Sequence, residues 1–150
     1  MRRRDMLILS LASLLTPIAI KASKAAEPLT LYKDPACGCC TGHADYLRAQ
    51  GFAVAVVEAA DLDAIRQRYG VPAELVGCHT IIAGNYVIEG HVPIEPIRRL
   101  LAERPDIVGI SLPGMPEGSP GMGGEKTGPF TIYQIDRAPA SDALKVFAVE

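Results

Sequence analysis

The chain has 150 residues, with 15 Lys and Arg against 17 Asp and Glu and a formal net charge of −2. Residues 1–25 hold five of the basic residues and one acidic residue, so residues 26–150 retain 10 basic and 16 acidic residues, a net charge of −6. This balance argues against nucleic acid as a partner and fits a soluble exported protein kept apart by like charge. The 125 residues of 26–150 suffice for one domain that folds on an apolar core without disulfide scaffolding.

Residues 1–25 have the layout of a secretory signal peptide. Arg2-Arg3-Arg4 is a basic start, residues 6–20 are largely apolar, and Ser23-Lys24-Ala25 is an acceptable cleavage site. The apolar run is shorter than the roughly 20 residues of a spanning helix, which favours cleavage over an uncleaved anchor. The arginines also resemble a twin-arginine signal, which exports folded proteins. We therefore expect residues 26–150 to be exported and free of the membrane after cleavage.

Alternating apolar patterns predict strands and helices in turn along residues 26–150. In chain order we expect a strand, a helix, a strand, a helix, two strands and a helix, over residues 29–32, 44–50, 52–57, 61–70, 80–83, 86–89 and 93–101. The 52–57 strand is expected to be buried. Asp61 is a plausible helix N-cap, and Gly84-Asn85 is a hairpin turn signal.

This order of elements is that of the thioredoxin and glutaredoxin core. A helix between the first two strands returns the chain to the same edge of the sheet and makes them parallel, and the hairpin adds an antiparallel strand. We therefore expect an α/β fold with a thioredoxin/glutaredoxin-like mixed sheet flanked by helices.

A long Gly/Pro-rich segment over residues 111–129 comes next, followed by two further strands over 130–135 and 144–149. A loop of this length in a compact domain is usually functional or disordered, and the return to strands favours a loop held over something. It carries Met115 and Met122, the two methionines of residues 26–150. Their thioethers are soft ligands that suit Cu(I), although chance placement explains them equally well.

The densest chemical signal is the stretch Asp34-Pro35-Ala36-Cys37-Gly38-Cys39-Cys40-Thr41-Gly42-His43, which holds three of the four cysteines. It falls in the turn between the first strand and the first helix, where the helix N-terminus favours thiolate over thiol. Thiolate is both a metal ligand and a nucleophile, so two chemistries stay open. Cys37 and Cys40 have the redox CxxC spacing. Adjacent Cys39 and Cys40, with Cys78 far away, argue against two structural disulfides.

Further candidate ligands lie near these cysteines or near the expected hairpin. His43 shares a helix face with Cys40 and is either a ligand or a helix-surface histidine. Cys78 precedes the third expected strand and either completes a four-thiolate set or stays a buried free thiol. His79 is expected to point away from Cys78 if the chain is extended there. His91 is either a ligand or a plain loop histidine.

Four blocks of the sequence resemble the signature of one bacterial family. They are residues 32–40, 77–80, 86–93 and 113–122, and they occur in order between about residues 28 and 136. The family was long catalogued as a domain of unknown function and includes the CopG-type copper-resistance proteins. The resemblance implies a thioredoxin-like fold, export to the periplasm, and copper binding by clustered cysteines in the handling of excess copper.

Carried over residue by residue, the resemblance implies copper ligation by Cys37, Cys39, Cys40 and Cys78, and with less support by His43, His91, Met115 and Met122. Thioredoxins carry a cis-proline where this chain has Cys78-His79, which favours a metal pocket over general disulfide exchange. We therefore predict a protein that binds one or more Cu(I) ions, with zinc as the competing metal and other periplasmic copper-handling proteins as further partners. The alternative is a thiol–disulfide oxidoreductase using Cys37 and Cys40. If the protein is an enzyme, we expect it to act on copper or on disulfides.

Overall fold

The computed structural model describes residues 27–138 and 143–150. The predicted signal peptide, residues 1–25, lies outside the described residues. Within the described ranges, no helix has the length and apolar character needed to cross a bilayer.

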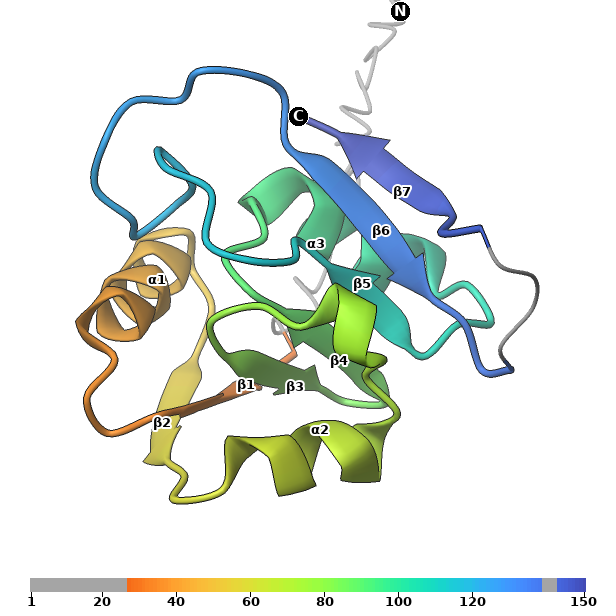
Figure 1. Ribbon diagram of the computed structural model, residues 1–150, viewed down its shortest axis with the longest axis horizontal. Helices are drawn as coiled ribbons and strands as arrows, with labels where there is room; N and C mark the ends of the chain where they lie inside the picture. Colours follow the sequence, from red (N-terminus) through yellow and green to blue (C-terminus); the bar gives the residue numbers. More distant parts are fainter. Residues whose placement is uncertain (1–26, 139–142) are drawn as a thin grey trace, which may run out of the picture.

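One mixed sheet of seven strands runs through the domain in the order β2-β1-β3-β4-β5-β6-β7 (Figure 1). The strands are β1 (Leu29–Lys33), β2 (Val54–Glu58), β3 (Thr80–Ala83), β4 (Tyr86–Glu89), β5 (Gly109–Ser111), β6 (Thr131–Ile135) and β7 (Val146–Val149). β1 is parallel to β2 and β4 is parallel to β5, while the other neighbouring strands are antiparallel. The expected parallel first pair and the expected hairpin are both present.

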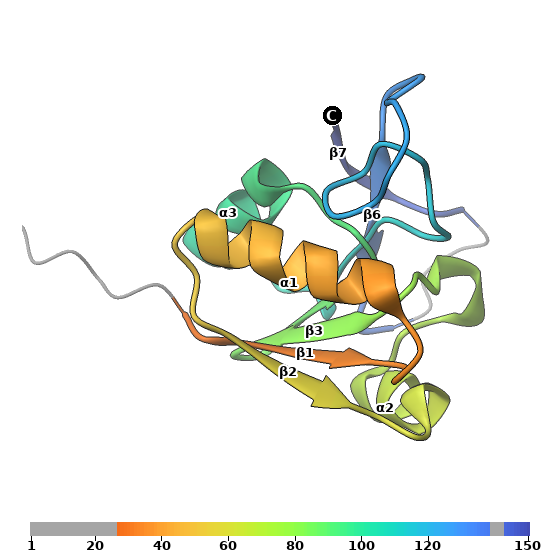
Figure 2. The same ribbon diagram turned by 90° about the vertical axis from the view of Figure 1, so that its left-hand side faces the viewer.

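The helices of the described chain are α1 (Gly38–Ala49), α2 (Leu62–Tyr69) and α3 (Ile94–Glu103), with a short 3-10 turn, η1 (Ala73–Leu75). Figure 2 shows α1 and α3 on one face of the sheet and α2 on the other. The predicted α/β class, a mixed sheet flanked by helices, is confirmed. The order from β1 to α3 is compatible with the expected thioredoxin-like core.

Some details differ from the sequence-based expectation. Helix α1 begins at Gly38 rather than near residue 44, so Cys39 and Cys40 lie inside the helix and Cys37 is its N-cap. Strand β2 is an edge strand and not a buried strand, because only Val54 and Val56 are half-buried against the core and its other side chains are exposed. Strand β5 has only three residues, which is too short for a recognisable apolar period. The Asp61 N-cap is confirmed, since its carboxylate accepts a hydrogen bond from the Ala64 N–H at 2.9 Å.

The main core lies between the sheet and the helices α1 and α3. Its fully buried side chains include Leu31, Leu47, Ile81, Ile88, Ile97, Leu100, Ile110 and Ile132. Helix α1 contributes the stripe Cys40, His43, Ala44 and Leu47, whose spacing of three and four residues is that of one helix face. Two candidate ligands therefore belong to the face that packs on the sheet, and core packing holds them in place.

The long Gly/Pro-rich segment covers the first turns of α1. It leaves β5, arches across the molecule and returns to β6 (Figure 1). A Cβ added to Gly42 would lie 2.8 Å from the Gly121 carbonyl oxygen, and one added to Gly121 would collide with the His43 backbone nitrogen. Gly121 also has a φ of +81°, a conformation that favours glycine. The expectation of a loop held over another part of the chain is confirmed.

Candidate metal centre

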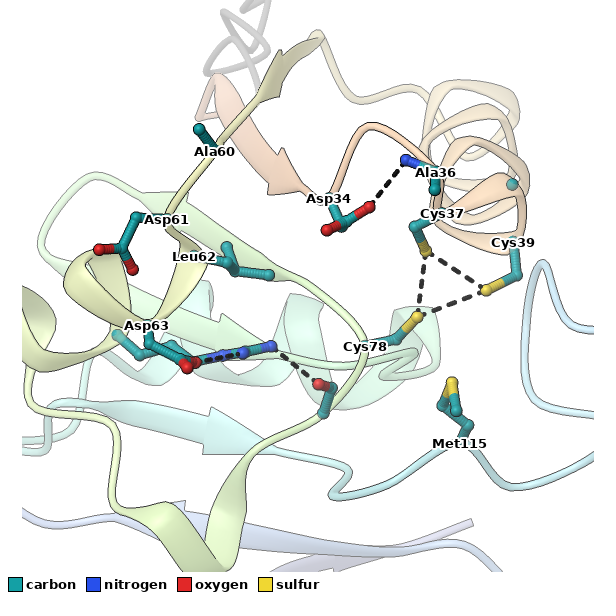
Figure 3. Close-up of a pocket in the computed structure, with 13 residues that line it drawn as sticks. Asp34, Ala36, Cys37, Cys39, Ala60, Asp61, Leu62, Asp63, Cys78 and Met115 are labelled. Carbon is teal, nitrogen blue, oxygen red and sulfur yellow. Dashed lines mark hydrogen bonds and ion pairs between the residues drawn. The ribbon is translucent and has the colours of Figure 1, made fainter.

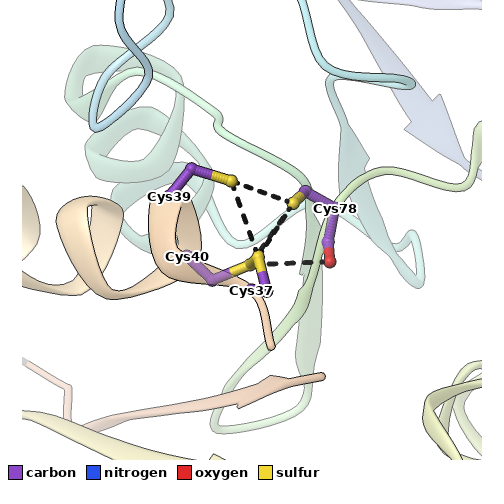
Figure 4. A group of neighbouring side chains, drawn as sticks. All are labelled: Cys37, Cys39, Cys40 and Cys78. Carbon is purple, nitrogen blue, oxygen red and sulfur yellow. Dashed lines mark hydrogen bonds between the residues drawn. A yellow bond between two sulfur atoms is a disulfide. The ribbon is translucent and has the colours of Figure 1, made fainter. Parts of the chain in front are cut away.

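The four cysteine sulfur atoms meet at the N-terminus of α1 (Figure 4). Cys78 Sγ lies between 3.2 and 3.4 Å from the sulfur atoms of Cys37, Cys39 and Cys40. The segment before β3 thus brings the Cys78 sulfur into contact with those of Cys37, Cys39 and Cys40, which are close to one another in sequence.

Cys37 and Cys40 are joined by a disulfide bond, with their Cα atoms 5.6 Å apart. Cys39 and Cys78 are free thiols. The pair with the redox CxxC spacing is therefore the bonded pair, and this form does not contain two structural disulfides. All four sulfurs become available as thiolates only after a two-electron reduction of the Cys37–Cys40 bond.

A tight turn places Cys37 at the start of α1. The Asp34 carboxylate accepts a hydrogen bond from the Ala36 N–H at 2.7 Å, and the Asp34 carbonyl accepts one from the Cys37 N–H at 3.0 Å. No side chain caps the helix at Cys37, so unpaired N–H groups of the first turn and the positive end of the helix dipole lie beside the sulfur atoms. This arrangement favours negative charge at the cluster.

An open cavity of about 700 Å³ gives access to the cluster (Figure 3). Cys37, Cys39 and Cys78 line it, whereas Cys40 is fully buried behind them. Met115 lies on the cavity wall with 60% of its surface exposed. Met122, in the same loop, is not among the described residues that line the cavity. The structure therefore brings one of the two methionines toward the cysteines.

All three histidines are fully buried and form a cluster next to the sulfur atoms, with ring centroids between 4.7 and 5.0 Å apart. His43 Nδ1 lies 2.8 Å from His79 Nε2, and His43 Nε2 lies 3.0 Å from the Val92 carbonyl oxygen. His91 Nδ1 lies 2.7 Å from the Pro120 carbonyl oxygen. Among the described residues, His79 Nδ1 and His91 Nε2 are buried without a hydrogen-bond partner. His43 is not a helix-surface histidine, and His91 is not a plain loop residue in solvent.

The expectation that His79 points away from Cys78 required an extended chain there, and that condition is not met. One ring nitrogen each of His79 and His91 lies within 4.8 Å of the other and of the sulfur atoms of Cys40 and Cys78. The reason is a bend at Cys78, ahead of the first residue of β3, so the alternation of side chains along an extended strand does not apply there. The site thus contains two overlapping donor groups, one of four sulfurs and one of two sulfurs and two nitrogens.

In the metal-free site, burial favours the uncharged forms of the three histidines and of Cys78, and at Cys78 it outweighs the helix N-terminus. Burial, with a contribution from neighbouring His91, lowers the pKa of His43 to about 3. Burial also lowers the pKa of His79 and of His91, so all three rings are neutral at pH 7. Burial raises the pKa of the Cys78 thiol to about 12, and the adjacent Cys39 thiol adds to this shift. A cation that binds Cys78 as thiolate must therefore displace its proton.

Glu89, a residue that the sequence analysis did not single out, anchors the chain around Cys78. Its buried carboxylate accepts hydrogen bonds from the Gly77 N–H at 3.0 Å and from the Thr80 hydroxyl at 2.6 Å. The available signal was a charged residue at the end of the apolar strand Tyr86–Glu89, where burial requires a partner. Thr80 faces Glu89 across the hairpin of β3 and β4, and Gly77 lies three residues before Thr80.

Comparison with known proteins gives one family and two solved structures. The family described as "Protein of unknown function, DUF411" matches residues 75–122. Two structures, both of a copper resistance protein CopG and described as Form 2 and Form 1, are 36% identical to the chain, with TM-scores of 0.75 and 0.74. Each comparison covers 83% of this chain and 98% of the other. No curated protein matches the chain.

Proposed function

The chain belongs to the family of the copper-resistance protein CopG, and from this starting point we propose that it binds Cu(I) in the periplasm as part of the handling of excess copper. The observation that carries the proposal is the convergence of Cys37, Cys39, Cys40 and Cys78, whose sulfur atoms lie within 4.8 Å of one another. Thiolates are soft ligands, and a cluster of them selects soft cations such as Cu(I).

The two donor groups share sulfur atoms, which supports binding of more than one ion. Cys40 and Cys78 belong both to the four-sulfur group and to the group that includes His79 and His91. A thiolate that belongs to two groups can bridge two ions. The mixed group of two sulfurs and two nitrogens also suits tetrahedral zinc, so zinc is the competing metal.

The buried histidine nitrogens fit a bound cation. His79 Nδ1 and His91 Nε2 have no hydrogen-bond partner, and a buried polar atom without a partner is unfavourable by about 1–3 kcal/mol. A cation bound by these two nitrogens would give both atoms a partner. We therefore place His79 and His91 with the four cysteines as proposed ligands, and Met115 at the cavity as a weaker one.

The periplasmic location rests on residues 1–25 and on the family. Cleavage after Ala25 would release residues 26–150, and the paired arginines would permit export of a folded chain. The mass of the protein recovered from the periplasmic fraction tests this, because a cleaved chain begins near residue 26. A full-length chain that stays with the membrane fraction would contradict it.

The test of copper binding uses the reduced chain of residues 26–150 under anaerobic conditions. Cu(I) is titrated against a competing chelator, and free thiols are counted before and after loading. We expect tight binding of at least one ion per chain with all four thiols protected. The variant Cys39→Ser should lose binding at high stoichiometry, and a variant that binds copper as well as the parent would refute the multithiolate site. A parallel zinc titration decides between the two metals.

The second candidate function is thiol–disulfide exchange by Cys37 and Cys40. The disulfide between them favours it, as does the position of Cys37 on the wall of the open cavity. This function predicts that Cys39→Ser still reduces insulin while Cys37→Ser does not. Weak Cu(I) binding together with two readily exchanged thiols would favour this function over copper handling.

A further inference from the structure

His43 is the member of the buried histidine cluster whose two ring nitrogens both have partners. His79 and the Val92 carbonyl occupy them, at 2.8 and 3.0 Å. A neutral imidazole has one N–H donor and one acceptor nitrogen, so its two partners determine which nitrogen carries the proton. The partners of His43 therefore determine its tautomer and, through it, that of His79.

The Val92 carbonyl oxygen can only accept a hydrogen bond, so His43 Nε2 must carry the proton. His43 Nδ1 is then an acceptor, and the 2.8 Å contact requires that His79 Nε2 donate to it. The single ring proton of His79 is thus on Nε2. Its Nδ1 keeps a free lone pair, and this is one of the two buried nitrogens without a partner.

His91 also has one protonated and one unprotonated ring nitrogen, and a carbonyl group of the long loop determines which is which. The Pro120 carbonyl accepts the hydrogen bond from His91 Nδ1 at 2.7 Å, which leaves the lone pair on Nε2. His91 Nε2 is the second buried nitrogen without a partner. The two nitrogens left unprotonated by this reasoning are therefore the two that lack partners, and both rings belong to the group with Cys40 and Cys78.

We propose that His43 and the Pro120 carbonyl are positioning groups, which fix the tautomers of His79 and His91 and so leave one unprotonated nitrogen on each ring of the group that also contains Cys40 and Cys78. His43 thereby acts through His79 and is not itself a ligand. The consequence for metal affinity rests on the proposed copper binding, whereas the tautomers themselves do not. Mutation of a group that orients a metal-binding histidine typically lowers the metal affinity by about 10- to 100-fold.

The contact between the loop and α1 couples the two positioning groups. Pro120 precedes Gly121, and Gly121 packs against the backbone of Gly42 and His43. The same close approach therefore positions the Pro120 carbonyl for His91 and covers the helix turn that carries His43. This assigns the loop a role that does not depend on its methionines.

The first test reads the tautomers of the metal-free protein by NMR. Long-range proton–nitrogen correlations of the imidazole rings identify which nitrogen carries the proton. We expect protons on His43 Nε2, His79 Nε2 and His91 Nδ1. A proton on His79 Nδ1 or on His91 Nε2 would overturn the proposal. Because no ion is present, this outcome is distinct from a failure of copper binding.

The second test compares His43→Phe with Leu47→Ala. Phe keeps an aromatic ring but removes both hydrogen bonds, so we expect a mixture of His79 tautomers and a Cu(I) affinity lower by about 10- to 100-fold. Leu47 lies one turn further along the same helix face and is fully buried, so its truncation weakens packing but leaves the three imidazole rings in place. It should lower stability and leave the His79 signals and the affinity unchanged. Equal effects of the two variants would overturn the proposal.

The third test compares two single variants, Gly121→Ala and Gly123→Ala. It remains informative if His43→Phe does not fold. A Cβ at Gly121 meets the His43 backbone, whereas one at Gly123 meets nothing within 4 Å. We expect Gly121→Ala to displace the Pro120 carbonyl and change the His91 tautomer, and Gly123→Ala to behave as the parent. An unchanged His91 signal in Gly121→Ala would overturn the role of Pro120. Loss of the His43 Nε2 proton on Cu(I) loading would show that His43 is a ligand instead.

Discussion

Arg66 donates a hydrogen bond from Nε to Glu89 Oε1 at 2.9 Å, and this buried ion pair holds the chain on both sides of Cys78. Arg66 also donates to the Gly77 carbonyl at 2.8 Å, while Glu89 accepts from Gly77 and Thr80. Cys78 is the one cysteine of the cluster that lies outside the stretch Cys37–Cys40 in the sequence. The pair therefore determines where the fourth sulfur atom lies.

Removal of the Glu89 carboxylate should be strongly destabilising. Glu89→Ala leaves the guanidinium of Arg66 without its buried carboxylate, and breaking a buried ion pair typically lowers the free energy of unfolding by about 3–5 kcal/mol. Asp63→Ala is the matched control, because Asp63 also pairs with Arg66 at 2.9 Å but its side chain is 79% exposed. We expect a loss of about 1 kcal/mol or less for that variant. Chemical denaturation measures both, and similar losses would contradict a special role for the buried pair.

The oxidised and reduced proteins should differ in thiol count and in copper capacity. Alkylation under denaturing conditions should label only Cys39 and Cys78 in the oxidised form, since Cys37 and Cys40 are bonded to each other. The reduced form should show all four thiols and bind more Cu(I) per chain. Mass spectrometry counts the labels, and titration against a chelator measures the copper. Equal copper capacity in the two forms would show that Cys37 and Cys40 are not needed as thiolates.

The metal-free protein should lose stability as the pH falls below about 6.5. Burial lowers the pKa of His43, His79 and His91 in the folded chain, so the unfolded chain binds more protons in this range. Each histidine contributes a loss of about 1.4 kcal/mol per pH unit, from its unfolded pKa down to its folded pKa. Glu89 acts in the opposite direction, because burial raises its pKa.

Urea denaturation of the metal-free chain at pH 7.5 and pH 5.5 measures this effect. The contribution is fully present at the higher pH and partly lost at the lower one. His91→Phe should show a smaller difference between the two conditions, since it lacks one of the three titrating rings. Equal stability of the parent protein at both pH values would contradict the buried, neutral state of the histidines.

The two methionines of the loop should differ in their effect on copper. Met115 lies on the cavity wall with Cys37, Cys39 and Cys78, and Met122 does not line that cavity. Met115→Leu should leave stability unchanged within about 0.5 kcal/mol, because the side chain is exposed, but it should weaken or slow Cu(I) uptake a few-fold. Met122→Leu should leave uptake unchanged. Stopped-flow transfer from a copper-loaded chelator measures the rates, and identical rates for both variants would rule out a role for Met115.

Local sequence patterns are sufficient to predict most of the helices and strands and to identify the cysteines as a candidate site. The hairpin at Gly84-Asn85 and the Asp61 cap depend on neighbouring residues only, and both are present. Helix α1 begins at Gly38, six residues before the predicted start at residue 44, and the sequence favours that later start because Gly38 and Gly42 are poor helix formers in isolation. Gly42 is explained only by the close approach of Gly121, a contact between distant segments.

The roles of the histidines required the folded chain. The stretch Cys37-Gly38-Cys39-Cys40 predicts a sulfur site from the sequence alone, because thiol chemistry is a property of the side chain itself. The direction of a ring and the position of its proton depend instead on partners far along the sequence. His79 is 36 residues from His43, His43 is 49 residues from Val92, and His91 is 29 residues from Pro120. A bend at Cys78 and a loop packed on α1 bring these groups together, and neither contact leaves a pattern in a single local stretch.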